Sequence, residues 1–203
     1  MLEFLHSKNI IYRDLHPENL LFDYKGYLRL IDFGFAKVCE GRTYTLCGTP
    51  EYMAPEIFLN KGYGRAVDWW AFGCMLYEFL VGITPFFEND PILIFKKVLK
   101  GEVKFPSNFP PAAKSLILHC LEKDEGKRYG SLIKGIQDIK GHRFFNGFDF
   151  NSLSKQKSRV PYIPQIDNAD DMKLLKIYTD EEEDAEEVNA EQDPFDEWIR
   201  KNK

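Results

Sequence analysis

Three oxygen-bearing side chains stand near the ends of a short predicted hairpin. Asp14 precedes the hairpin, Asn19 opens its first strand, and Asp32 follows its second strand. Because a hairpin brings its two ends together, we expect the three side chains to converge at one edge. Two carboxylates and an amide oxygen are hard ligands, which suit Mg²⁺ held against phosphates rather than zinc. A lone Asp at a strand end is more often a cap or turn residue, so the joint pattern carries this prediction.

The elements around this site follow from hydrophobic periodicity and from turn residues. Residues 20–22 and 27–31 flank a turn that ends in Gly26, which predicts the hairpin. Residues 1–6 are typical of the last turns of a helix, and residues 32–57 of an ordered, functional loop. Further helices are expected over residues 68–80, 91–99, 112–121 and 136–140, with an extended tail from about residue 150.

The charge of the chain is concentrated in its tail. The 203 residues carry a formal net charge of −5, and residues 180–197 hold 11 acidic and no basic side chains. Without that block the other 185 residues have a net charge of +6. This charge is too small to indicate nucleic-acid binding.

The cysteines and the apolar runs favour the cytoplasm or the nucleus. Cys39, Cys47, Cys74 and Cys120 form no CxxC pair and no zinc-binding spacing. No signal peptide is expected after Met1. The most apolar stretch, residues 69–83, is shorter than the roughly 20 residues of a membrane span, so we expect a buried helix and no span.

Three motifs carry a resemblance to a known family. Tyr-Arg-Asp-Leu-His-Pro-Glu-Asn at residues 12–19, Asp-Phe-Gly at 32–34 and Ala-Pro-Glu at 54–56 resemble the catalytic loop, metal loop and activation-segment end of eukaryotic protein kinases. Residues 41–52, 66–71 and 105–107 resemble the cyclic-AMP-dependent type of the AGC group. The similarity extends from about residue 2 to residues 161–164. It implies an α+β fold: a mostly helical large (C-terminal) lobe over residues 1–150 with a short β-hairpin, then an AGC-type tail over 151–203.

The resemblance also implies catalytic roles. Asp14 would accept or orient the proton of the substrate hydroxyl, and Asn19 and Asp32 would hold Mg²⁺ against ATP. His16 stands where the family has a lysine that reaches the transferred phosphate. The imidazole is shorter and is not a permanent cation at pH 7.

A phosphorylation site and two structural elements are implied in the same way. Thr45 resembles the activation-segment phosphosite, with Arg13 and Lys37 as the cations that would pair with its phosphate. Asp68 would cap the buried helix and brace the catalytic loop. Glu56 and Arg128 would form a buried ion pair.

The implied substrate is a basic, Arg-rich Ser/Thr site. Glu18 and Glu78 match positions that receive an arginine, and Glu51 matches a further basic-residue contact. Leu46, Pro50 and Met53 would form an apolar pocket for the residue after the acceptor. Thr49 would be the threonine that bonds the catalytic loop and would complete the substrate-binding region. A cAMP-binding regulatory subunit is a further implied partner.

The sequence also departs from the family. No Gly-rich loop and no strand lysine precede Tyr12, so we expect the ATP-binding small lobe to be absent and the chain to be inactive alone. Leu21 and Tyr178 are candidates for nucleotide contact, although Tyr178 is the one residue that matches the family's tail motif at this place. Residues 195–198 resemble the hydrophobic motif of the family's C-terminal tail. Without a small lobe, Leu5, Leu21 and Phe33 should lie exposed.

Two other functions can be compared with the kinase interpretation. A non-catalytic module could keep the groove of Glu18, Glu51, Glu78 and Leu46 and bind substrates or a regulatory subunit. A metal-dependent hydrolase would need a water-activating base beyond Asp14, and the sequence offers none.

Overall fold

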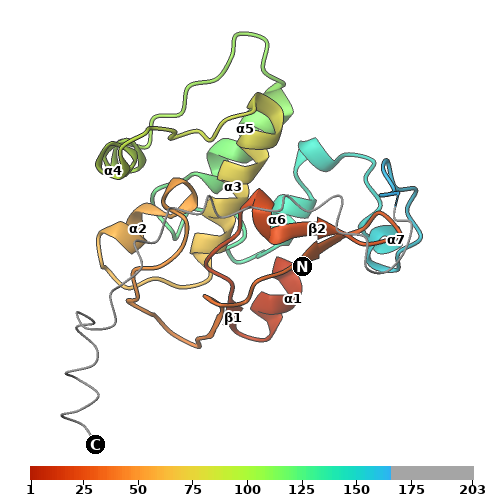
Figure 1. Ribbon diagram of the computed structural model, residues 1–203, viewed down its shortest axis with the longest axis horizontal. Helices are drawn as coiled ribbons and strands as arrows, with labels where there is room; N and C mark the ends of the chain where they lie inside the picture. The colour runs from red at the N-terminus through yellow and green to blue at the C-terminus, as the bar shows by residue number, and fades with distance from the viewer. Residues whose placement is uncertain (166–203) are drawn as a thin grey trace, which may run out of the picture. The chain divides into compact units, whose positions relative to one another are not determined.

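The computed structural model describes residues 1–165, and the expectations at Tyr178 and at residues 195–198 lie outside them. Helix α3 (Ala66–Val81) is the central element, and most of its side chains are buried. It packs beside α5 (Pro111–Cys120), as Figure 1 shows. Gly73 permits this packing, since a Cβ there would stand 2.8 Å from Cβ of Cys120.

Two buried clusters line the two sides of α3. One contains Trp70 together with residues of the helices α2 (Pro55–Phe58) and α4 (Pro91–Lys100). The other contains Trp69, Tyr12 and residues of α1 (Leu2–Ser7). The catalytic-loop residues around Tyr12 are thereby fixed against the helical core.

Two short antiparallel pairs position the candidate site. Strand β2 (Leu20–Phe22) pairs with β3 (Leu28–Leu30) in the register Leu20 to Leu30. Strand β1 (Ile10–Ile11) pairs with β4 (Lys37–Val38). In the turn between β2 and β3, the carboxylate of Asp23 accepts the backbone N–H groups of Lys25 and Tyr27.

The remaining described elements are short: the 3₁₀ helices η1 (Pro17–Asn19), η2 (Pro50–Tyr52) and η3 (Arg143–Phe145), and the helices α6 (Gln137–Lys140) and α7 (Phe150–Ser154). The expected mostly helical α+β fold with a short hairpin is therefore confirmed. No helix among residues 1–165 is both long enough and apolar enough to cross a membrane.

Two expectations differ from the structure. The chain is not extended from residue 150, because α7 follows there, and the compact unit runs from Met1 to Pro164. Residues after α7 pack on the hairpin: the Tyr27 hydroxyl donates to the Ser158 carbonyl at 2.8 Å, and the rings of Phe22 and Tyr162 lie 5.4 Å apart.

Leu5 was expected to be exposed and is instead buried, because α1 packs against the cluster of Trp69 and Tyr12. Leu21 and Phe33 are exposed as expected, Phe33 by 50%.

Candidate active site

The carboxylate of Asp14 is held by hydrogen bonds from Thr49 and Asn19, and His16 lies beside it. Its Oδ1 accepts the hydroxyl of Thr49 at 2.8 Å and the backbone N–H of Thr49 at 3.0 Å. Its Oδ2 accepts the Asn19 amide Nδ2 at 3.1 Å, and Nε2 of His16 lies 3.4 Å away. Donors from two segments therefore fix the orientation of this carboxylate.

His16 does not extend from the loop. Its side chain is largely buried, and its ring lies 5.7 Å from the ring of Tyr52, measured between centroids. The imidazole faces Asp14, so the group in the place of the family's lysine is a neighbour of the candidate base.

Asn19 connects Asp14 to the second end of the hairpin. Its side chain donates to Asp14, and its backbone carbonyl accepts the N–H of Ile31 at 3.0 Å, one residue before Asp32. Asp32 has a φ of 51°, and its Oδ1 accepts the backbone N–H of Gly34 at 2.9 Å. The hairpin thus brings Asp14, Asn19 and the turn at Asp32 to one edge.

Tyr12 contacts the residues on both sides of Asp32. Its hydroxyl donates to the Ile31 carbonyl, and its ring meets that of Phe33 edge-on at 5.5 Å. The pKa of Tyr12 is raised, first by burial and then by the negative charges of Asp14 and Asp32. Both carboxylates therefore act on one phenol.

The donor set at this edge fits Mg²⁺. The Asn19 amide nitrogen is used by Asp14, which leaves its Oδ1 oxygen for a cation, and Asp32 adds a carboxylate. Within residues 1–165 no three His, Cys, Asp or Glu side chains gather into a metal cage. Mg²⁺ suits such a sparse site, because it keeps water and phosphate ligands beside one or two protein oxygens.

Asp68 braces the catalytic loop from below. Its buried carboxylate accepts the backbone N–H groups of Tyr12 at 3.0 Å and Arg13 at 2.8 Å. Nε2 of His6 lies 2.7 Å from the same carboxylate, a partner that sequence reasoning missed. Asp68 was expected to cap its helix, and this prediction is wrong. Asp68 lies in the first turn of α3, after the N-cap residue Arg65, and its carboxylate binds the loop instead.

Tyr63 organises the activation segment and was also missed. Its hydroxyl donates to the Thr45 carbonyl at 2.6 Å, and NH1 of Arg13 donates to this hydroxyl at 3.3 Å. Residues Thr43 and Tyr63 form an isolated antiparallel bridge. The pKa of Tyr63 is raised to about 12, first by burial. Only the short Gly-Tyr-Gly sequence at residues 62–64 marks this position.

Arg13 and Lys37 have other partners than Thr45. Nε of Arg13 donates to the Phe35 carbonyl, and Lys37 donates to the hydroxyl of Thr43 at 3.0 Å. The side chain of Thr45 itself is exposed. Both cations thus bind residues other than Thr45: Arg13 binds Phe35, and Lys37 binds Thr43.

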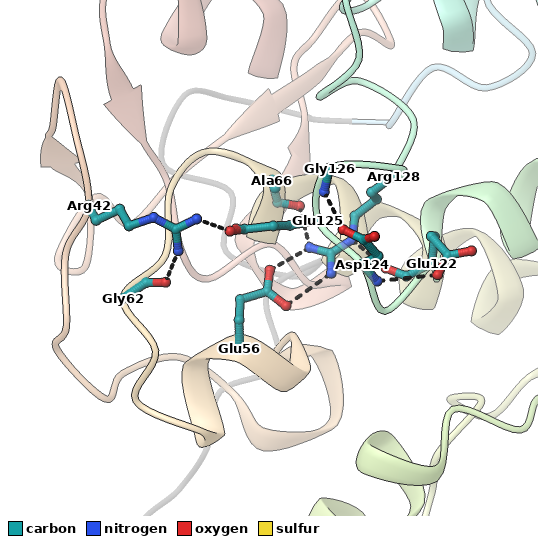
Figure 2. A network of polar contacts seen from close by, with 9 residues as sticks. All are labelled: Arg42, Glu56, Gly62, Ala66, Glu122, Asp124, Glu125, Gly126 and Arg128. Carbon is teal, nitrogen blue, oxygen red and sulfur yellow. Dashed lines mark hydrogen bonds and ion pairs between the residues drawn. The ribbon is translucent and has the colours of Figure 1, made fainter.

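A buried ion pair joins the end of this segment to the loop after α5. The guanidinium of Arg128, fully buried, binds both oxygens of Glu56 at 2.6 and 2.9 Å. It also donates to the carbonyls of Ala66 and Glu122 (Figure 2). Figure 2 shows a second pair nearby, in which Arg42 binds Glu125 and the Gly62 carbonyl.

The residues assigned to substrate binding are spread over η1, η2 and α3. Glu18 is exposed in η1, and Leu46 is 69% exposed. Glu51 accepts the hydroxyl of Thr84, and Glu78 accepts the hydroxyl of Tyr52. Pro50 is exposed, whereas Met53 is 5% exposed and belongs to the core.

Comparison with known proteins agrees with this geometry. The model of the protein kinase domain family matches residues 1–145. The chain belongs to the protein kinase family, as its motifs had indicated.

The curated relatives narrow the class. The chain is 48% identical to a cAMP-dependent protein kinase catalytic subunit of Dictyostelium discoideum, over 92% of the chain and 28% of the relative. It is 45% identical to the mouse cAMP-dependent protein kinase catalytic subunit PRKX, over 90% of the chain and 52% of the relative. It is 43% identical to yeast cAMP-dependent protein kinase type 3, over 89% of the chain and 46% of the relative. The chain therefore spans about a quarter to a half of the length of these relatives.

Proposed function

We propose that this chain supplies the phosphoryl-transfer and peptide-docking part of a cAMP-dependent-type Ser/Thr protein kinase, which transfers the γ-phosphate of ATP to Arg-rich sites. The observation that carries the proposal is the arrangement of Asp14 with Asn19 and Thr49 at one edge of the hairpin. Phosphoryl transfer depends mainly on positioning and charge neutralisation, which such an arrangement can provide.

In the proposed reaction, Asp14 accepts the proton of the substrate hydroxyl while the hydroxyl oxygen attacks the γ-phosphorus of ATP. The bond from that phosphorus to the β,γ-bridging oxygen breaks, and ADP leaves. Thr49 holds Oδ1 of Asp14, so Oδ2 is the oxygen left to face the hydroxyl, beside Asn19. Asn19 and Asp32 would hold Mg²⁺, which neutralises phosphate charge when bound. Leu21, exposed on β2, would contact the nucleotide.

His16 makes this site slower than one with lysine. The imidazole lies 3.4 Å from Asp14, so it is directed at the base and not outward toward a phosphate. Loss of one preorganised positive group can reduce the rate by about 10²–10³. In a form that includes a small lobe, His16→Lys should raise kcat, and an unchanged kcat would contradict this role.

We further propose that phosphorylation of Thr45 orders the activation segment. Its exposed side chain can be modified, and Arg13 and Lys37 lie on segments bonded to its neighbours Tyr63 and Thr43. A phosphate there would accept charge-assisted hydrogen bonds from both cations. Arg-rich substrates and a cAMP-binding regulatory subunit are the proposed partners. The cytoplasm or nucleus is the proposed location, supported by four free cysteines.

For a polypeptide of these 203 residues alone, we expect no measurable transfer, because no Gly-rich loop or strand lysine stands before Tyr12. Incubation with Mg·ATP and an Arg-rich peptide tests this, with Asp14→Asn as the control. A rate comparable to a full kinase would overturn the expectation. Loss of that rate in Asp14→Asn would then assign it to this site.

The second candidate is a non-catalytic binding module. It is favoured by the carboxylates of Glu51 and Glu78, each of which is oriented by a hydroxyl donor of the chain itself. Thermal shift with Mg·ATP, followed by titration with the Arg-rich peptide, separates the two functions. Peptide binding without nucleotide binding favours the module, whereas binding of both favours the kinase site.

A further inference from the structure

Two hydrogen bonds connect η2 with the end of α3 in a reciprocal way. Thr84, just after α3, donates its hydroxyl to Oε2 of Glu51 in η2 at 2.8 Å. Tyr52 in η2 donates its hydroxyl to Oε2 of Glu78 in α3. Each acidic side chain is therefore held by a hydroxyl from the other segment.

Thr84 is a rigidly placed donor. It is 4% exposed, and Pro85 after it favours an extended backbone at Thr84. The next residue, Phe86, is fully buried and stacks on Trp70 with ring centroids 5.6 Å apart. A buried hydroxyl requires a partner, and the Glu51 carboxylate is that partner.

This contact leaves Glu51 in a defined state. Its Oε2 accepts the Thr84 hydroxyl, and the other carboxylate oxygen, Oε1, can accept a cationic side chain. A charge-assisted bond restricts the rotamers of a partly exposed glutamate before any ligand arrives. A preoriented carboxylate binds a guanidinium with a smaller loss of entropy.

Tyr52 plays the same part for Glu78. Burial first, and then the bond to Glu78, raise the pKa of Tyr52, so its hydroxyl is protonated and donates. The two carboxylates are thus fixed on two sides of the junction between η2 and α3.

We propose that Thr84 is a positioning residue for basic-peptide selectivity: it holds Glu51 so that this carboxylate receives one particular arginine of an Arg-rich ligand. The inference rests on the proposed peptide-docking function of Glu51. It adds that the selectivity depends on a hydroxyl that does not itself touch the peptide.

The test measures binding to the full chain by fluorescence anisotropy. The probe is labelled Arg-Arg-Arg-Arg-Ala-Ala-Leu, with alanine at the acceptor position, together with four peptides in which one arginine is replaced by alanine. Glu51→Gln first identifies the arginine that Glu51 binds. Thr84→Val removes the hydroxyl with little change of shape, and Thr84→Ser keeps it.

We expect Thr84→Val to weaken binding of the parent peptide about threefold to tenfold, which corresponds to the loss of one typical hydrogen bond. The peptide lacking the Glu51-dependent arginine should bind Thr84→Val and the unsubstituted chain equally. Thr84→Ser should bind within about twofold of the unsubstituted chain. In Glu51→Gln, Thr84→Val should have little further effect, since the two substitutions remove one interaction.

Several results would overturn the inference. Equal weakening of all five peptides by Thr84→Val, or no weakening at all, would show that Thr84 does not act through Glu51. If Thr84→Val does not fold, as judged by thermal denaturation, Thr84→Ala carries the same expectation. If no peptide binds the unsubstituted chain, the proposed docking function fails and this inference with it. Binding that is insensitive to Thr84 rejects the inference alone.

Discussion

Thr49 donates both its hydroxyl and its backbone N–H to a single oxygen of Asp14, at 2.8 and 3.0 Å. The two residues lie 35 positions apart, and both hydrogen bonds are part-buried. This contact joins the activation segment to the candidate base, so the position of one depends on the position of the other.

Thr49→Val should therefore destabilise the fold by about 1–2 kcal/mol, because it removes a hydrogen bond to a charged acceptor in a part-buried place. Urea denaturation measures the free energy of unfolding. Thr49→Ser is the matched control and should retain most of the stability. An equal loss in the serine variant would mean that the methyl group, not the hydroxyl, matters.

Asp68 supports the catalytic loop through its backbone. Arg13 has a φ of 72°, a conformation that side-chain-bearing residues seldom adopt, and its N–H is bound by Asp68. Asp68→Ala leaves one buried and one part-buried N–H group without an acceptor and should cost about 2–5 kcal/mol. Asp68→Asn keeps an acceptor oxygen and should cost less. Hydrogen exchange should speed up at the amides of Tyr12 and Arg13 in the alanine variant, and unchanged exchange there would contradict the bracing role.

Local patterns in the sequence were sufficient to predict the hairpin and what it gathers. The turn that ends in Gly26 joins the two apolar strands, and their register brings Asn19 to the turn at Asp32. The four helices predicted after residue 57 were correct, because residues 68–80 are nearly all apolar, residues 91–99 and 112–121 are amphipathic, and Gly141 follows the short helix at residues 136–140.

Contacts between distant segments could not be predicted in this way. Tyr63 binds Thr45, and Thr84 binds Glu51, through single hydroxyls that leave no periodic signal. Leu5 was misjudged because its cover comes from Trp69 and Tyr12, not from a lobe beyond the chain. The burial of Met53 could not be predicted either, since its place in the core depends on helices that follow it.

The Glu56–Arg128 pair should be among the most sensitive sites in the protein. Glu56→Ala leaves a fully buried guanidinium without its carboxylate, which should cost about 3–5 kcal/mol. The double variant Glu56→Leu/Arg128→Met removes both charges and should recover part of that loss. Urea denaturation of the three proteins tests this. If the double variant is less stable than Glu56→Ala, the ion pair contributes net stability to the fold, beyond the compensation of one buried charge by the other.

Arg42 and Glu125 form the exposed counterpart of that pair. The Arg42 side chain is half exposed, so the ion pair is screened by solvent and should contribute about 0.2–1 kcal/mol. Arg42→Ala should lower stability within that range in dilute buffer, and by less in 1 M salt. The charge exchange Arg42→Glu/Glu125→Arg should restore stability relative to either single reversal. Failure of the exchange would indicate that the bond from Arg42 to the Gly62 carbonyl is the stabilising one.

His142 should make stability depend on pH in the mildly acidic range. Its Nδ1 accepts the N–H of Phe144 at 3.2 Å, and its Nε2 lies 3.1 Å from the hydroxyl of Ser115. Burial, then the neighbouring charges of His119 and Arg143, lower the pKa of His142 below its ordinary value of 6.5.

Because the folded pKa is lowered, the unfolded chain binds the proton more readily. The stabilisation from neutral His142 is thus fully present above about pH 6.5 and is lost as pH falls toward the folded pKa. His142→Asn keeps an acceptor for Phe144 but does not titrate. The free energy of unfolding should decrease from pH 7.5 to pH 5.5 in both proteins, and this decrease should be larger in the unsubstituted protein than in His142→Asn. Since the other three histidines are common to both proteins, equal falls would exclude His142 as the titrating group.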